Sequence, residues 1–191
     1  MLNQKKAGEN YLVASTETAL ADLDLEEGHP EQAETILRRS IAEFEKEHED
    51  PDAISAYTLL SRALLTEQKP DDARKAIQRA IELSRASSLP ALKIPASIQS
   101  ARVALATGDA SAASSARQQL RSAISTTKRL GYYDLECEAR LALAEAELKN
   151  SGASARTQLS ALSREARNHG MQLIAKSAER AAAGSNTIAL K

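Results

Sequence analysis

The sequence predicts an all-α fold built from repeated helix pairs, and two observations support this prediction. Segments of the chain return after a shift of 40 residues, so that Leu25, Pro30, Ala33 and Ile41 recur as Leu65, Pro70, Ala73 and Ile81. Apolar residues make up 42% of the chain and aromatic residues only 3%, and alanine and leucine, both strong helix formers, dominate the apolar share. Such a period is typical of stacked helical units that bury their apolar faces against neighbours. We therefore expect an α-α superhelix, or solenoid, of about four helix pairs with a C-terminal capping helix.

The first helix pair is predicted over residues 8 to 47. Its first helix runs from about Gly8 to Glu27, and Gly28 ends it because glycine readily takes the left-handed conformation after a helix. Pro30 suits the first position of the next helix, where its missing N–H costs no hydrogen bond. Apolar residues of the first helix include Tyr11, Leu12, Leu20 and Leu23, and those of the second form one stripe of Ala33, Leu37, Ile41 and Phe44.

The second and third pairs are predicted over residues 51 to 86 and 90 to 130. Pro51, Pro70 and Pro90 mark helix starts. Pro95 predicts a kink or a late start in the fifth helix, because proline removes a backbone hydrogen bond and clashes with the preceding turn. After the turn at Gly108, the apolar stripe comes three residues later than a strict period would place it, at Ala116, Leu120, Ala123 and Ile124.

The fourth pair is predicted over residues 132 to 168, followed by a capping helix over 171 to 183. The cap places Leu173, Ile174 and Ala178 inward and Lys176, Glu179 and Arg180 outward, and a polar outer face is what a terminal solenoid element needs. Residues 184 to 191 are predicted to be a flexible tail. We expect residues 1 to 183 to form a single helical repeat domain.

Charge and composition exclude several function classes. The net charge is −1, with 12 basic and 18 acidic side chains in residues 1–100 and 13 basic and 8 acidic in 101–191. A near-neutral total argues against nucleic-acid binding, which needs many cations. The chain has no stretch as apolar as a membrane span and one cysteine, Cys137, so we expect no membrane span and no internal disulfide. Cytoplasmic localisation is the expectation, or periplasmic if the chain is a fragment of a larger protein.

We expect no enzyme, no catalytic residue, no cofactor and no metal site. His29, His48 and His169 lie far apart, and none has a second histidine at the helical spacing that forms a metal-binding face. Cys137 has glutamates on both sides and lies on the inward side of its helix, which predicts a buried thiol rather than an activated nucleophile. The glycines never gather into a phosphate-binding loop.

The repeated residues resemble the tetratricopeptide repeat family. The first unit has the family's pattern in Leu20 with Ala21, Gly28, Ala33, and Ser40 with Ile41, and the second has Leu60 with Ser61, Ala73, and Ala80 with Ile81, with Gln68 in place of the turn glycine. Units near 40 residues, longer than the usual repeat of about 34, resemble modules appended to bacterial signalling and regulatory proteins. The resemblance covers about residues 15 to 183. It implies a non-catalytic scaffold that binds a peptide or protein partner in its concave groove, as a regulatory module of a larger bacterial signalling protein.

Groove positions follow from taking Leu20 as the register mark in the first helix of each pair. They are Thr18, Asp22, Thr58, Arg62, Ile98, Arg102, Leu141 and Glu145. The guanidinium groups of Arg62 and Arg102 would grip a carboxylate of the partner. The alternative is that each arginine pairs with the nearest acidic residue of its own scaffold.

A second function remains open from the charge distribution. The acidic N-terminal half and the basic C-terminal half suit a structural module that self-associates end to end. The sequence leaves the oligomeric state open between a monomer and a weak dimer.

Overall fold

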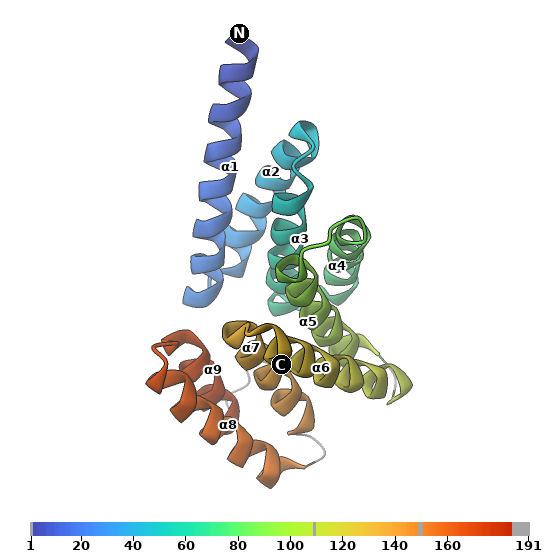
Figure 1. Ribbon diagram of the computed structural model, residues 1–191, viewed down its shortest axis with the longest axis vertical. Coiled ribbons are helices and arrows are strands. Elements are labelled where there is room, and N and C mark those ends of the chain that lie inside the picture. The colour runs from blue at the N-terminus through green and yellow to red at the C-terminus, as the bar shows by residue number, and fades with distance from the viewer. Residues whose placement is uncertain (1, 109, 149–150, 185–191) are drawn as a thin grey trace. The chain divides into compact units, whose positions relative to one another are not determined.

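The computed structural model describes residues 2–108, 110–148 and 151–184, with side chains from residue 8 onward, and the predicted tail beyond Gly184 lies outside them. These residues form nine α-helices and no strand, which confirms the predicted all-α class. The backbone contacts divide the chain into two compact units, residues 1–103 and 104–191, which are described separately (Figure 1). The single domain over residues 1 to 183 therefore stays a prediction.

The first unit contains four complete helices and most of a fifth. These are α1 (Leu2–Glu27), α2 (Pro30–Glu47), α3 (Asp50–Thr66), α4 (Pro70–Ser84) and α5 (Pro90–Thr107). One predicted start is corrected, and one of the two alternatives for the fifth helix is excluded. The α1 helix begins at Leu2 rather than near Gly8, because its polar first residues include the good helix formers glutamine and lysine. The α5 helix begins at Pro90 and contains Pro95, so the late start is wrong; a proline in the second turn removes only one early hydrogen bond.

The core of the first unit forms between helices that are neighbours in sequence. The α1 helix packs on α2, α2 on α3, and α3 on α4, and α1 also touches α3. Alanines that are almost fully buried allow close approach of the backbones, and larger side chains fill the space between them, chiefly Leu37, Phe44, Ile54, Leu64 and Ile77. The predicted stripe of α2 is confirmed, since Ala33, Leu37, Ile41 and Phe44 are all buried.

A short chain of buried polar groups joins three helices of the first unit. The Ser61 hydroxyl on α3 donates to the Ala73 carbonyl on α4 at 2.9 Å. The Gln99 amide on α5 donates to the Ser61 hydroxyl at 3.3 Å. Because buried polar groups are costly unless paired, this chain fixes the register of the second helix pair against α5.

The turns after α1 and α3 share one backbone conformation. Gly28 has φ 88°, as predicted for the residue that ends α1. Gln68, which stands 40 residues later, has φ 61° and so takes the same left-handed conformation without being glycine. A non-glycine residue pays a steric cost there, so the shared turn reflects the packing of the helix pairs rather than the preference of residue 68.

The second unit contains α6 (Ala110–Leu130), α7 (Tyr133–Glu147), α8 (Gly152–Asn168) and α9 (Gln172–Ala182). Successive helices pack on one another, and α9 touches both α7 and α8. Their core includes Cys137, Leu141, Leu159, Leu162 and Ala178. The inward position of Leu173 is wrong: this side chain is 51% exposed, because Ala175, Ala178 and Ala181 form the buried side of the short α9 helix.

Candidate partner-binding surface

Four of the predicted groove positions lie on α1 and α3, the first helices of the two pairs in the first unit. Thr18 and Thr58 are half-buried, and each hydroxyl donates to the carbonyl four residues earlier, Ala14 at 2.9 Å and Ile54 at 2.8 Å. Such bonds hold the threonine methyl groups in fixed orientations on the helix surface. Asp22 and Arg62 lie one turn further along their helices and contact each other.

Arg62 on α3 joins the two helices through acidic residues of α1. Its Nη1 donates to the Asp22 carboxylate at 3.1 Å, and its Nη2 donates to the Glu26 carboxylate. The guanidinium side chain is 39% exposed, Asp22 is 52% exposed and Glu26 is largely covered. Arg62 thus pairs with acidic residues of its own scaffold, as the alternative to a carboxylate grip predicts, and it remains accessible from solvent.

The remaining predicted groove positions lie on α5 and α7. Ile98 on α5 is only 3% exposed, so it offers a partner almost no surface. Arg102 on α5 is half-buried and belongs to the first unit, while Glu145 on α7 is half-buried and belongs to the second. Leu141 on α7 is buried in the core of the second unit. Among the predicted residues, the contacts described above bring together Asp22 and Arg62.

The exposure of a group of apolar side chains on α1 was not predicted from the sequence. Leu12, Val13, Leu20 and Leu23 are each more than half exposed, although the three leucines were grouped with Tyr11 as apolar residues of the first helix. The buried side of α1 consists instead of Ala14 and Ala21, with Tyr11 and Leu25 packed beside them. At 100° per residue the two sets fall on opposite faces of the helix, which the sequence could have revealed.

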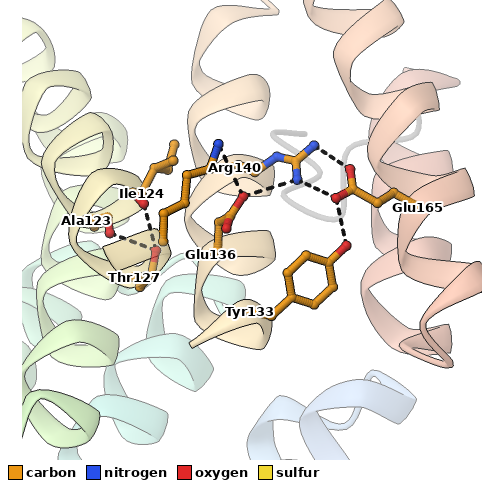
Figure 2. Close-up of polar contacts among 8 residues, drawn as sticks. Ala123, Ile124, Thr127, Tyr133, Glu136, Arg140 and Glu165 are labelled. Carbon is orange, nitrogen blue, oxygen red and sulfur yellow. Dashed lines mark hydrogen bonds and ion pairs between the residues drawn. The ribbon is translucent and has the colours of Figure 1, made fainter. Parts of the chain in front are cut away.

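The second unit contains a polar cluster between α6, α7 and α8. Figure 2 shows the Arg140 guanidinium between two carboxylates, with Nη1 and Nη2 donating to both oxygens of Glu165 at 3.0 and 2.7 Å. Arg140 Nη1 also donates to Glu136 at 3.4 Å, and Lys128 lies 3.6 Å from that carboxylate. The Tyr133 hydroxyl donates to Glu165 at 2.7 Å. Two cations and two anions balance, which indicates a structural network.

The electrostatics of this network follow from its hydrogen bonds. The bonds from Arg140, and then from Tyr133, lower the pKa of Glu165 from its ordinary value to about 2. Burial and the bond to Glu165 raise the pKa of Tyr133. Glu165 is therefore charged and Tyr133 neutral at physiological pH, so the network holds α7 against α8 as a fixed ion pair.

Two further groups bear on catalysis and metal binding. Cys137 is fully buried, and burial raises the pKa of its thiol, which makes it a poor nucleophile. Asp24, Glu27 and His29 bring one ligand atom each within 4.8 Å of one another at the turn after α1. The turn at Gly28 brings His29 back beside α1, which the helical spacing of histidines did not predict. Exposed acidic groups of this kind are common at protein surfaces, and we assign no metal to them.

Comparison with known proteins adds one finding on the first unit. Residues 12–86 match the sequence model of the family described as Tetratricopeptide repeat. The match runs from Leu12 on α1 past the end of α4, so it contains the second helix pair and all of the first pair except residues 2–11 of α1. A search of curated proteins found no significant match. Within the described residues, no helix has both the length and the apolar character needed to cross a membrane.

Proposed function

Residues 12–86 match the model of the tetratricopeptide repeat family, whose repeats generally mediate protein–protein interaction, and we propose on this basis that the chain is a non-catalytic module that binds a partner in a groove. The first helices of the pairs, α1 and α3, line that groove in the first unit. The partner binds in this groove through a peptide or a protein segment. The setting we propose is a regulatory module of a larger bacterial signalling protein.

The observation that supports this proposal is the position of Arg62 between α1 and α3. Asp22 and Glu26 hold its guanidinium in place, so a ligand that binds there does not pay to order a long flexible side chain. The two bonds use part of the five N–H donors of an arginine, and 39% of the side chain is exposed. A carboxylate of the partner binds the remaining donors and competes with the more exposed Asp22.

The groove extends in our proposal beyond this pair. Thr18 and Thr58 present methyl groups to the partner because their hydroxyls are bonded to backbone carbonyls. Arg102 on α5 supplies a second guanidinium to the groove of the first unit. Glu145 on α7 is proposed separately, as a partner-binding position of the second unit taken by itself. Ile98 supports the groove from within, since it is buried.

The groove proposal is tested by capture of partners from a lysate of the source cells. Wild-type protein is compared with the double variant Arg62→Glu and Arg102→Glu, which reverses both proposed anion-binding charges. We expect at least tenfold less captured partner with this variant, measured by quantitative mass spectrometry. The matched control is Arg74→Glu with Arg79→Glu, which makes the same charge change on exposed positions of α4. Equal recovery with the groove variant and wild type would remove the groove assignment.

A second candidate function is end-to-end self-association, and the charge of the two units favours it. Residues 1–103 carry 13 basic and 18 acidic side chains, and residues 104–191 carry 12 basic and 8 acidic. Opposite net charges attract over about 10 Å at low salt and are screened as salt rises. We expect sedimentation velocity to show assembly at 20 mM salt that is lost at 500 mM. A monomer at every salt concentration would exclude this candidate.

A further inference from the structure

The outer face of α1, which we define as Leu12, Val13, Thr16, Leu20 and Leu23, is an apolar surface open to solvent. Its four large apolar side chains are 52% to 64% exposed. They make up four of the seven exposed large apolar residues in the described part of the chain. A helix that is apolar on opposite faces is typical of an element covered on both sides.

The repeat itself indicates what kind of element covers such a face. A shift of 40 residues takes Val13, Thr16, Leu20 and Leu23 of α1 to Ala53, Ala56, Leu60 and Ala63 of α3. These four residues of α3 are at most 3% exposed. The α3 helix has α4 as the second helix of its own pair, and it also packs on α2 from the preceding pair. The α1 helix has its own pair partner, α2, but no preceding pair in the described residues. The outer face of α1 therefore corresponds to a face that α3 buries, and α2 is one of the helices that pack on α3.

The charges around this face determine which helix suits it. Between Gly8 and Glu27, α1 carries six carboxylates and no basic side chain. Arg39 binds Glu17, and Arg62 binds Asp22 and Glu26, which leaves the helix with a net negative charge. A second copy of α1 would place these acidic side chains against one another. A helix with lysines or arginines beside its apolar stripe would instead be attracted.

We propose that the outer face of α1 binds a basic amphipathic helix of a partner protein, which lies antiparallel to α1 as α2 lies on α3. The partner's apolar stripe has the spacing of Ala33, Leu37, Ile41 and Phe44 in α2. Its basic residues lie beside the carboxylates of α1. This surface faces away from the side of α1 that packs on α2 and α3, and the proposal does not depend on binding in the groove.

The probe that tests this proposal is an 18-residue peptide with the sequence of residues 30–47 in which all five glutamates are replaced by lysine. It keeps the stripe of α2 and carries a positive charge. Two peptides serve as controls: the unchanged α2 sequence, which is acidic, and a scrambled peptide with the composition of the lysine probe but no stripe. Binding is measured by fluorescence anisotropy on the full chain at 150 mM salt. We expect the lysine probe to bind at least tenfold more tightly than either control.

The protein variants locate the binding on α1. Leu20→Asp with Leu23→Asp changes two exposed residues of the outer face, so its circular dichroism melt should match wild type, and we expect at least a tenfold loss of probe binding. Leu173→Asp, a change at an equally exposed leucine on α9, should bind like wild type. Equal binding of the scrambled peptide, or unchanged binding to the α1 variant, would overturn the proposal. A wild-type dimer that Leu20→Asp with Leu23→Asp dissociates would also overturn it, because a second copy would then cover the face.

Discussion

Leu64→Ala is expected to lower the free energy of unfolding by about 2–5 kcal/mol, the range for a leucine truncated in a packed core. Leu64 on α3 is 1% exposed and belongs to the core between the first two helix pairs. Its loss removes apolar contacts and leaves a cavity that rigid helices cannot close fully. Urea denaturation followed by circular dichroism measures the change.

The matched control for Leu64 is another leucine of the same unit. Leu23 on α1 is 52% exposed, so Leu23→Ala should change the free energy of unfolding by less than about 0.5 kcal/mol. Both substitutions remove the same atoms from a leucine. A difference between Leu64→Ala and Leu23→Ala in the free energy of unfolding therefore reports burial rather than residue type. A change below about 0.5 kcal/mol for Leu64→Ala would mean that the buried face of α3 is assigned wrongly.

Arg140→Met is expected to destabilise the second unit at pH 7 by about 1–2 kcal/mol, with an effect that fades in acid. The folded protein holds the pKa of Glu165 at about 2, below its ordinary value of 4.5. A depressed carboxyl pKa stabilises the fold above pH 4.5, and this stabilisation is lost as the pH falls toward 2. Each pKa unit corresponds to about 1.4 kcal/mol. Because the Glu165 side chain is 37% exposed, solvent screening reduces the full value.

The measurement compares urea denaturation of wild type and Arg140→Met at pH 7 and at pH 3. The difference in free energy of unfolding between the two proteins at pH 3 should be less than about half of the difference at pH 7. At pH 3 the Glu165 carboxylate is protonated in the unfolded chain but still largely charged in folded wild type. Lys176→Met, which removes one exposed cation from α9, should show little difference at either pH. A difference for Arg140→Met that stays the same from pH 7 to pH 3 would contradict the role assigned to Glu165.

Sequence reasoning predicted the helices better than their environments. Pro30, Pro70 and Pro90 each begin a helix, and Gly28 takes the left-handed conformation after α1. Such signals act within a few residues of the chain, so they can be recognised without the fold. The first residues of α1 carry no such signal, and that start was predicted six residues late.

The orientation of α1 needed the structure. Both of its faces are apolar, so periodicity alone does not tell which face meets α2. The buried side holds Ala14 and Ala21, because small residues let α2 approach closely, and the larger Leu20 and Leu23 are left outside. Comparison with α3 would have suggested the opposite, since Leu60 is buried at the position equivalent to Leu20.

Some polar contacts between helices could be predicted from the sequence and others could not. Asp22 and Arg62 were assigned to the same predicted groove because they are 40 residues apart, which is the repeat period. In the structure, Arg62 Nη1 lies 3.1 Å from Asp22 Oδ1. Arg140 and Glu165 have no such relation in sequence, since their pairing depends on how α7 crosses α8. Side chains from different helices meet at a point that only the packing determines.

The most direct test of the proposed function places a photo-crosslinking amino acid at Thr58, on the proposed groove side of α3, in protein exposed to the source-cell lysate. The control places the same group at Gln78, an exposed position on α4. We expect a crosslinked partner from position 58, lost when Arg62→Glu is added, and none from position 78. A partner that crosslinks only from position 78, or equally from both, would contradict the proposal that the first helices of the repeats form the binding surface.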